Sequence, residues 1–310
     1  MDFKRLPTVL TAEELIDKMF KKASKVGGRD LKDRTINKLS TISNTTHDYF
    51  QRILKEHPEY EKLPDFYREM VDILVGVARL KKALASLLWA DKMIQKVVSK
   101  SIAETKRGND PHKILKSTYG RIASIIDQID EQLQLLNYAK NRLKEIPSLR
   151  DIPTVVVAGY PNVGKSSFVA AVSTAKPEIA SYPFTTKEIK VGIARINGKE
   201  IQILDTPGLL DRPLSEKSEI ELKAILCLQY LADLIVFIID PTETCGYSLE
   251  NQLSLLNEVK NMFKKPIIEV YSKSDMHNFQ DRLTFSAKTG EGIKEIMDEI
   301  AKKIKNKRQQ

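Results

Sequence analysis

Apolar residues recur at intervals of three and four through the first half of the chain, the spacing that places them on one face of an α-helix. Thr11-Ala12-Glu13-Glu14 has the form of a capping box, and Gly27-Gly28 has the form of a helix stop. A helix is therefore predicted between them. Further helices are predicted from about residue 33 to 57, around 64–74, and from 77 to about 106.

The most regular pattern of this half begins after Gly108-Asn109-Asp110-Pro111, which is predicted to break one helix and start the next. Apolar residues there follow a heptad stripe formed by Leu115, Ile122, Ile129, Leu136 and Leu143, with Tyr119, Ile126 and Leu133 between them. Such a stripe predicts one long helix of about four heptads. We interpret it as core rather than as a partner-binding face. The first half is therefore expected to be an all-helical bundle of antiparallel helices.

Beyond a short connection at 147–153 the pattern changes to strands alternating with helices. Strands are predicted at 154–158, 188–196, 200–204, 233–239, 266–271 and 282–285, and helices at 165–173, 218–231, 249–263 and 292–305. This alternation is typical of an α/β fold with a mostly parallel sheet. We expect two domains, a helical one at 1–150 and an α/β one at 151–310.

Composition narrows the class of protein. No run approaches the ~18 apolar residues of a membrane span, and the start, Met1-Asp2-Phe3-Lys4-Arg5, lacks the apolar core of a signal peptide. The final residues carry no prenylation cysteine. Cys227 and Cys245 lack metal-ligand spacing, which indicates a reducing compartment. We expect a cytoplasmic protein without a membrane partner.

Charge is distributed unevenly between the two halves. Residues 1–150 hold 29 Lys+Arg and 20 Asp+Glu, whereas residues 151–310 hold 21 of each, so the first half carries the whole net charge of +9. Either this half faces a polyanion or its lysine-rich helices are simply well solvated. A basic cluster lies around the predicted helix break and consists of Lys106, Arg107, Lys113, Lys116 and Arg121. Because aromatic residues are sparse, the cluster fits backbone contacts with folded RNA better than single-strand binding.

The clearest chemical motif is Gly159-Tyr160-Pro161-Asn162-Val163-Gly164-Lys165-Ser166-Ser167, between a predicted strand and a predicted helix. That context is the one a phosphate-binding loop requires. Backbone N–H groups and the helix dipole attract phosphate. Lys165 is expected to reach the β- and γ-phosphates, and the Ser166 hydroxyl to ligate Mg²⁺.

Two further segments follow in the order expected of a nucleotide switch. In Tyr182-Pro183-Phe184-Thr185-Thr186, Thr186 can offer its hydroxyl to Mg²⁺ and its backbone to the γ-phosphate. In Asp205-Thr206-Pro207-Gly208, Asp205 suits Mg²⁺ through water and the Gly208 N–H can approach the γ-phosphate. Phe184 and Thr185 are assigned to nucleotide binding with them.

Two segments at later strand ends predict a guanine site. In Ser272-Lys273-Ser274-Asp275, the Asp275 carboxylate can accept two hydrogen bonds from the Watson–Crick edge of guanine, which adenine does not offer. In Ser286-Ala287-Lys288, the Ala287 N–H is placed for the guanine oxygen. The predicted ligands are therefore GTP or GDP with Mg²⁺, and an ATPase is disfavoured mainly by Asp275.

These motifs together resemble the Obg-related, translation-factor-class GTPases, in which a Tyr-x-Phe-Thr-Thr switch is typical. Within that group the chain resembles the nucleolar GTP-binding protein (Nog) family. The resemblance rests on the phosphate loop and on the segments 205–213, Asp-Thr-Pro-Gly-Leu-Leu-Asp-Arg-Pro, and 240–248, Asp-Pro-Thr-Glu-Thr-Cys-Gly-Tyr-Ser. It extends to the helical half through Leu6-Pro7-Thr8-Val9, Tyr119-Gly120-Arg121-Ile122-Ala123 and Ile146-Pro147-Ser148. The long C-terminal extension of eukaryotic members is absent, which is more typical of an archaeal member.

The resemblance implies a Ras-like P-loop GTPase domain and an Mg²⁺-dependent GTPase that assists assembly of the large ribosomal subunit. Its helical domain would dock on the subunit or its precursor, contacting rRNA and ribosomal proteins, and the free protein would be a monomer. A eukaryotic member would be nucleolar. Two alternatives stay open. One is a signalling or trafficking GTPase, and the other is a non-catalytic RNA-binding scaffold with a structural nucleotide site.

Two residues depart from common GTPase patterns. Ser272 stands where Asn or Thr is usual, so nucleotide affinity is expected to be weaker while Asp275 keeps the guanine preference. Leu209 stands where Ras-like enzymes have a water-orienting glutamine, which predicts slow intrinsic turnover. Asn162 resembles the loop asparagine that binds K⁺ in cation-dependent relatives, and a K⁺ ion there could stabilise the transition state. The catalytic residues are therefore predicted to be Asn162, Lys165, Thr186 and Gly208, and the metal ligands Ser166, Thr186 and Asp205.

Overall fold

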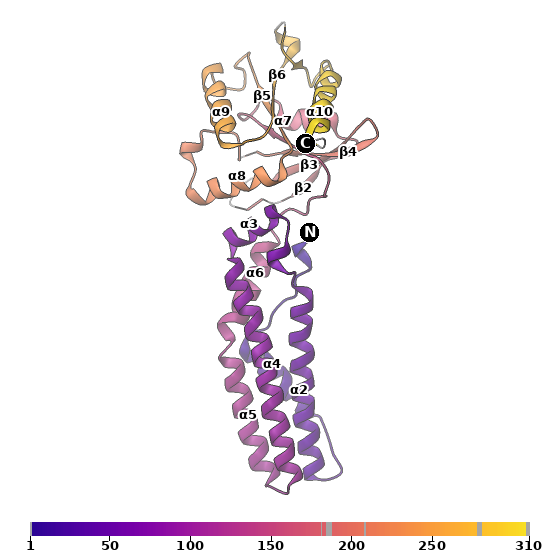
Figure 1. The fold of residues 1–310 in the computed structure, drawn as a ribbon, viewed down its shortest axis with the longest axis vertical. Coiled ribbons are helices and arrows are strands. Elements are labelled where there is room, and N and C mark those ends of the chain that lie inside the picture. The colour runs from indigo at the N-terminus through magenta and orange to yellow at the C-terminus, as the bar shows by residue number, and fades with distance from the viewer. Residues whose placement is uncertain (1, 181, 184–187, 208, 278–280, 308–310) are drawn as a thin grey trace. The chain divides into compact units, whose positions relative to one another are not determined.

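The computed structural model describes residues 2–180, 182–183, 188–207, 209–277 and 281–307. They form two compact units (Figure 1). The helical unit comprises Asp2–Leu63 and Leu74–Lys144, and the α/β unit comprises Pro64–Ile73 and Glu145–Gln310. Among the helices described, none combines the length and apolar composition that crossing a membrane requires.

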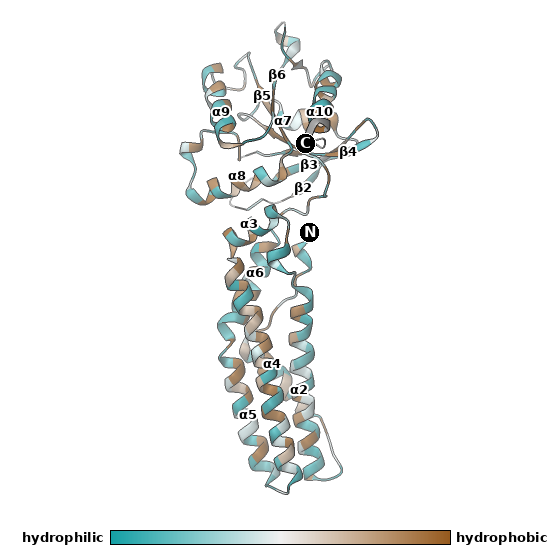
Figure 2. Ribbon diagram, in the orientation of Figure 1, coloured by the Kyte–Doolittle hydropathy of each residue, from teal (hydrophilic) through white to brown (hydrophobic). Residues whose placement is uncertain are grey.

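The helical unit is built from long helices whose buried faces pack together. Its helices are α1 (Ala12–Ser24), α2 (Leu31–Glu56), α4 (Val77–Lys106), α5 (Pro111–Asp127) and α6 (Asp130–Leu143). Helix α4 contacts α2, α5 and α6, and α1 contacts α2 and α5. Figure 2 shows hydrophobic and hydrophilic residues alternating along α2, α4 and α5. The bundle predicted from the periodicity is confirmed.

The helix starts follow the predicted capping chemistry. The Thr11 hydroxyl accepts a hydrogen bond from the Glu14 N–H (3.3 Å), and the Glu14 carboxylate accepts one from the Thr11 N–H (2.9 Å). Asp110 caps α5 by accepting from the N–H of His112 (2.9 Å), with Pro111 as the first helical residue. Both starts satisfy N–H groups that would otherwise lack partners.

The single long helix expected after Pro111 is wrong. The chain forms α5 and α6 instead, with a break at Gln128 and Ile129. The core stripe also differs in α5, where Ile114 and Thr118 are buried and Leu115 and Tyr119 are only partly so. Ile129 stays buried at the break, so the interruption preserves the apolar face that the heptad pattern describes.

The short helix α3 (Asp65–Leu74) packs within the α/β unit, although its sequence lies among the bundle helices. The Tyr67 hydroxyl accepts a hydrogen bond from the Leu149 N–H (2.9 Å) and donates one to the Leu149 carbonyl (3.4 Å). The Phe66 ring lies 6.4 Å from the ring of Tyr182. The compact units therefore interleave along the sequence, where the pattern alone suggested one boundary at residue 150.

Seven strands of the described residues form one mixed sheet in the order β2-β3-β4-β1-β5-β6-β7. The antiparallel part consists of β2 (Glu178–Ala180), β3 (Ile189–Ile196) and β4 (Lys199–Asp205), and the parallel part adds β1 (Thr154–Ala158), β5 (Leu234–Ile239), β6 (Ile267–Ser272) and β7 (Thr284–Phe285). All residues of β1 and β5 are buried, as expected of parallel strands covered on both faces. The three-residue β2 was not predicted, because so short a strand shows no alternation.

The helices of this unit are α7 (Lys165–Val172), α8 (Glu219–Leu231), α9 (Leu249–Met262) and α10 (Ile293–Lys307). In Figure 1 they surround the strands, and α7 and α10 contact β3 while α9 contacts β5. Strands β1, β5 and β6 run parallel, so their carboxyl ends meet at one edge of the sheet. Loops that follow these ends carry the predicted site.

Candidate nucleotide-binding site

The loop between β1 and α7 has a backbone that only glycine fits at its first position. Gly159 has φ +133°, and a Cβ there would lie 2.4 Å from the carbonyl oxygen of Ile238. Gly164, with φ +103°, precedes the first residue of α7. The Gly159 N–H donates to the Leu210 carbonyl (3.0 Å), which ties the loop to the chain that follows β4. These conformations turn the loop over the start of α7.

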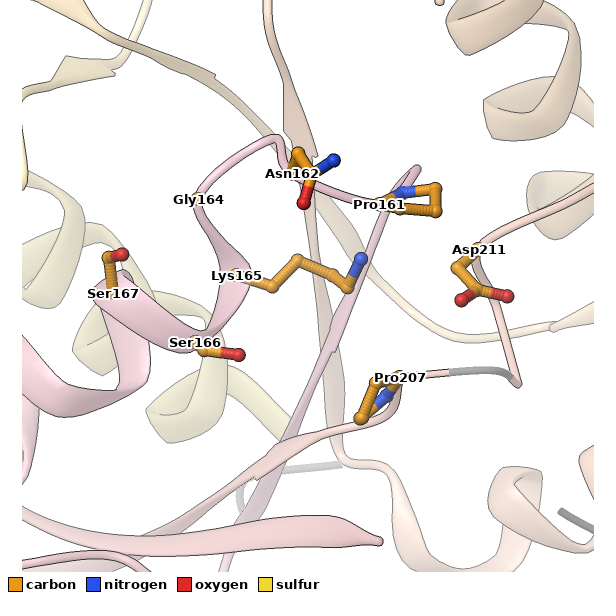
Figure 3. A pocket seen from close by; sticks show the side chains of 8 residues that line it. All are labelled: Pro161, Asn162, Gly164, Lys165, Ser166, Ser167, Pro207 and Asp211. Atoms are coloured by element: carbon orange, nitrogen blue, oxygen red, sulfur yellow. The ribbon is translucent and has the colours of Figure 1, made fainter. Parts of the chain in front are cut away.

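A cavity of about 370 Å³ opens at this loop and at the N-terminus of α7 (Figure 3). Eight residues line it, namely Pro161, Asn162, Gly164, Lys165, Ser166, Ser167, Pro207 and Asp211. The free N–H groups and the dipole of a helix start attract anions. Six of the lining residues belong to the predicted phosphate loop, so the structure brings that motif together around one space.

Lys165 lies under the loop rather than in solvent. Its side chain is buried, and its ammonium donates to the carbonyl oxygens of Gly159 (2.7 Å) and Tyr160 (2.6 Å). Those bonds hold a cation beside the cavity. A phosphate in the cavity would therefore meet a positive charge that is already placed.

Ser166 and Asp205, two of the three predicted metal ligands, are hydrogen-bonded to each other. The Ser166 hydroxyl donates to Oδ2 of Asp205, while Oδ1 of the same buried carboxylate has no hydrogen-bond partner among the residues that the structure describes. A buried, unpartnered carboxylate oxygen beside a hydroxyl is a donor set that suits Mg²⁺, either directly or through water. The two residues fit the ion that the motif predicts.

The predicted switch residues Phe184, Thr185, Thr186 and Gly208 lie outside the described residues. Next to them, Tyr182 is buried and its hydroxyl donates to the Ala224 carbonyl of α8 (2.8 Å). Burial raises the pKa of Tyr182 well above its ordinary value.

Leu209 is also buried, and its N–H donates to the Thr206 carbonyl (3.2 Å). The Leu209 side chain therefore packs in the protein interior.

The predicted base-binding segments lie at the ends of β6 and β7. Ser272 is buried and donates to the Ile239 carbonyl (3.2 Å), and its Cβ would lie 3.8 Å from a Cβ placed on Gly164. The small serine thus packs directly beneath the phosphate loop. Asp275 is exposed, and a hydrogen bond from the buried Ser286 hydroxyl lowers its pKa. The same Ser286 oxygen accepts from the Lys288 N–H (3.2 Å), so Asp275 and segment 286–288 form one local site.

Lys273 belongs to a network that the sequence did not predict. Its ammonium lies 2.5 Å from Oδ2 of Asp240 and 2.5 Å from the Thr244 hydroxyl. Asp240 also accepts from the N–H groups of Cys245 (2.8 Å) and Thr242 (3.0 Å). Burial raises the pKa of Asp240, but the hydrogen bonds from Lys273, Thr242 and Cys245 outweigh it and lower the pKa to about 2. The position of Asp240, directly after the apolar strand β5, was the signal that could have revealed it.

The segment 240–248 also reaches the phosphate loop. The Tyr247 ring lies 4.3 Å from the ring of Tyr160. Gln252 of α9 holds the segment, accepting from the Asp240 N–H (2.7 Å) and donating to the carbonyls of Asp240 (2.9 Å) and Tyr247 (3.0 Å). The base-binding and phosphate-binding parts of the site are thereby linked through one well-bonded loop.

Comparison with known proteins identifies the family of the chain. The family model described as the NOG1 N-terminal helical domain matches residues 3–150, and that described as Nucleolar GTP-binding protein 1 (NOG1) matches residues 219–275. An archaeal relative, an uncharacterized protein of Methanocaldococcus jannaschii, is 42% identical over 287 residues, covering 88% of this chain and 81% of that protein.

Eukaryotic relatives are longer. Nucleolar GTP-binding protein 1 of Drosophila melanogaster is 30% identical over 294 residues, which cover 90% of this chain but 45% of that protein. A solved structure of a putative nucleolar GTP-binding protein 1 from Plasmodium falciparum is 31% identical, covers 53% of this chain and 92% of that one, and has a TM-score of 0.47. The resemblance stated from the motifs is confirmed, and the chain belongs to the nucleolar GTP-binding protein 1 family, with an N-terminal helical domain followed by a GTP-binding, P-loop GTPase domain.

Proposed function

We propose that this protein is an Mg²⁺-dependent, GTP-hydrolysing switch that assists assembly of the large ribosomal subunit. The observation that carries the proposal is the meeting of two chemistries at one sheet edge. The phosphate cavity at Lys165 and Ser166 lies there, and so does the Asp275 carboxylate, which accepts a hydrogen bond from the Ser286 hydroxyl. Family membership supports GTP as the nucleotide.

At the phosphate end, Lys165 and the start of α7 would neutralise the β- and γ-phosphates. Ser166 and Asp205 would hold Mg²⁺ with Thr186, which the sequence adds to the set. Bound there, Mg²⁺ would balance the negative charge that builds on the phosphates during hydrolysis. Oδ1 of Asp205, which has no hydrogen-bond partner in the described part of the chain, supports this assignment.

At the base end, the exposed Asp275 carboxylate would accept two hydrogen bonds from guanine. Its lowered pKa keeps it ionised at neutral pH, which the acceptor role requires. Lys273, Ser272, Ala287 and Lys288 would complete this part of the site. The smaller Ser272 leaves the loop without an amide contact, so we expect weaker guanine-nucleotide affinity than Asn would provide.

Intrinsic hydrolysis is proposed to be slow. The buried Leu209 cannot orient water, and Asn162, which lines the phosphate cavity with φ +62°, is the proposed K⁺ ligand. A monovalent cation there would add positive charge near the reacting phosphates. Faster hydrolysis in KCl than in NaCl, with the difference removed by Asn162→Ala, would support this role, and equal rates would contradict it.

The helical unit is proposed to dock on rRNA and ribosomal proteins through its basic tip, which we define as Lys25, Arg29, Lys32, Lys106, Arg107 and Lys113. All six side chains are exposed. The Lys32 ammonium donates to the Lys106 carbonyl (3.0 Å), which places the α1–α2 turn beside the α4–α5 turn. Clustered cations of this kind contact the phosphate backbone. The monomeric protein would act where ribosomes are assembled, which is the nucleolus in eukaryotes.

The test is RNA crosslinking and co-sedimentation with large ribosomal subunits, carried out separately with GTP, GDP and a non-hydrolysable GTP analogue. Association that depends on both salt and nucleotide supports the proposal. Binding to liposomes instead would favour a signalling or trafficking role. Association with large subunits that is equal with all three nucleotides would favour a scaffold. The matched control is Asp275→Asn, which should lose the response to GTP and gain one to xanthosine triphosphate, because the amide complements the C2 carbonyl of xanthine.

A further inference from the structure

Asp211 places a carboxylate in the phosphate cavity. The sequence motifs gave this residue no role. It lines the cavity with Lys165, Ser166 and Pro207, and the residue is only 5% exposed. In Figure 3 its side chain stands across the pocket from Ser166 and Ser167. Acidic groups are rarely buried unless they are paired, and this one also shares its space with the proposed phosphate site.

The backbone that leads into Asp211 is held in place. Leu209 and Leu210 are 1% and 0% exposed, so both anchor the segment in the core. The Leu210 carbonyl accepts from the N–H of Gly159, the first residue of the phosphate loop (3.0 Å). The position of Asp211 is therefore coupled to the loop that would hold the phosphates.

Cationic side chains lie near Asp211. Burial and the Arg212 guanidinium lower the pKa of the buried Lys217, whereas the carboxylates of Asp211, Glu221 and Glu216 act in the opposite direction. Lys217 thus attracts Asp211, and Lys165 lines the same cavity as Asp211. Arg212, the nearest arginine to the switch segment, is ion-paired with Glu221 (3.2 Å). These cations offset the repulsion between a carboxylate and a nearby phosphate.

We propose that Asp211 is a catalytic residue of GTP hydrolysis, taking over the water-orienting role that Leu209 cannot perform. This inference rests on the proposed function. Asp211 would accept a hydrogen bond from the attacking water and aim its oxygen at the γ-phosphorus. The new O–P bond forms as the bond to the β–γ bridging oxygen breaks. The electron pair of the broken bond stays on GDP, and the water proton passes through the carboxylate to a phosphate oxygen, giving GDP and inorganic phosphate.

The experiment measures single-turnover hydrolysis of preloaded GTP, with K⁺, Mg²⁺ and large ribosomal subunits present. Asp211→Asn keeps the shape of the side chain and removes the charge, and Asp211→Glu restores the charge at a longer reach. Asp298→Asn is the matched control, because Asp298 is exposed on α10. GTP and GDP affinities of each variant are measured by titration with fluorescent nucleotides, and folding by circular dichroism.

For Asp211→Asn we expect hydrolysis to fall by about 100-fold or more, with GTP affinity within about threefold of the wild type. Asp211→Glu should recover part of the rate, and Asp298→Asn should be unchanged. A purely structural role would lower nucleotide affinity and rate together, and that outcome would overturn the inference. A rate for Asp211→Asn within threefold of the wild type would do the same and leave the proposed function standing. If the wild type binds GTP but hydrolyses none, the proposed function fails as well.

Discussion

The basic tip of the helical unit and the proposed nucleotide site of the α/β unit use charged side chains in opposite ways. The basic tip of the helical unit consists of exposed lysines and arginines, whereas the site of the α/β unit depends on buried polar groups, among them Lys165, Asp205, Asp240 and Ser286. Exposed charges act through an electrostatic potential that salt screens, and each charge contributes only part of that potential. Buried polar groups act through fixed geometry, and losing one partner is costly.

The same contrast holds for the backbone. In the α/β unit, Gly159 adopts φ +133° against the Ile238 carbonyl, while Gly120 lies on the exposed face of α5 with no described atom within 4 Å of an added Cβ. One glycine is required by the site, and the other is merely tolerated by a helix. The comparison can be tested by making the same change at both positions.

The largest effect is expected from Gly159→Ala. Left-handed strain and the clash with a backbone oxygen should lower the free energy of unfolding of the α/β unit by about 4 kcal/mol. Gly120→Ala should stabilise the helical unit by about 1 kcal/mol, since alanine is the better helix former. Hydrogen exchange of β1 and β5 peptides reports on the α/β unit, and fluorescence of Trp89, the one tryptophan of the sequence, reports on α4. Equal effects at the two glycines would refute the contrast.

His57 shows that the helical unit also has a buried polar group. It is 7% exposed, its Nδ1 lies 2.7 Å from the Tyr60 hydroxyl, and Nε2 has no hydrogen-bond partner in the described part of the chain. Burial lowers the pKa of His57 from 6.5 to about 4. In the unfolded chain the imidazole binds a proton at the ordinary pKa, so acid favours unfolding.

We therefore expect the helical unit to lose about 2 kcal/mol of stability between pH 7 and pH 5 through His57 alone. The measurement is denaturant unfolding followed by Trp89 fluorescence at both pH values. His57→Gln removes the titrating group. The loss of unfolding free energy between pH 7 and pH 5 should therefore be about 2 kcal/mol smaller in this variant than in the wild type. An identical pH dependence in the two proteins would show that the imidazole is not protected from protons in the folded state.

Lys273→Met tests the buried network of the α/β unit. The change removes a cation from the fully buried Asp240, which keeps its bonds to Thr242 and Cys245. Because the Lys273 side chain is 25% exposed and other donors remain, we expect a loss of about 1.5 kcal/mol in stability. GDP affinity should fall about tenfold, since segment 272–275 loses its link to segment 240–248.

The matched control for that change is Lys260→Met. Lys260 pairs with Glu269 (2.6 Å) on the same unit, but its side chain is 43% exposed. Surface pairs contribute little, so we expect an effect below about 0.5 kcal/mol and no change in GDP affinity. If both lysine variants behave alike, the network around Asp240 does not shape the base-binding site.

Sequence reasoning succeeded where the chemistry is local and failed where it is not. The strand, the glycine turn and the helix around residues 159–167 could be predicted because glycine spacing, a preceding apolar strand and a following helix are adjacent in the chain. The link between Asp240 and Lys273 joins residues 33 positions apart, and neither carries a local sign of the other. Likewise α3 lies between bundle helices in sequence, and its packing, which includes Phe66 and Tyr67, assigns it to the α/β unit.

The helix break at Gln128 and Ile129 was missed for a different reason. A heptad pattern records which face of a helix is apolar, and Ile129 stays buried as α6 begins. When the apolar face continues through a helix break, the spacing of hydrophobic residues does not reveal the break. No glycine or proline lies at this one. The position of the basic tip was also difficult to predict from the sequence. Charge asymmetry indicated a polyanion partner, but only the Lys32–Lys106 contact placed two separate turns side by side.

The smallest and most salt-dependent effect is expected at the basic tip. Reversing Lys106, Arg107 and Lys113 to Glu should weaken association with rRNA or large subunits by about tenfold at low salt, and progressively less as salt rises. The slope of log affinity against log salt should become shallower by about 0.7–0.9 for each phosphate that the variant no longer neutralises. GTP affinity should not change, because the substituted residues belong to the helical unit.

The control reverses Lys264, Lys294 and Lys302, three exposed lysines of the α/β unit, so that both triple variants have the same net charge. If the two variants lose RNA association equally, binding follows total charge, and the basic tip is only a well-solvated surface. If the tip variant alone is weakened, position matters as well as charge. A single substitution, Lys113→Glu, should then show a fraction of the triple effect. That graded response is what separates a screened surface from a site such as Gly159, where one methyl group is expected to abolish the geometry.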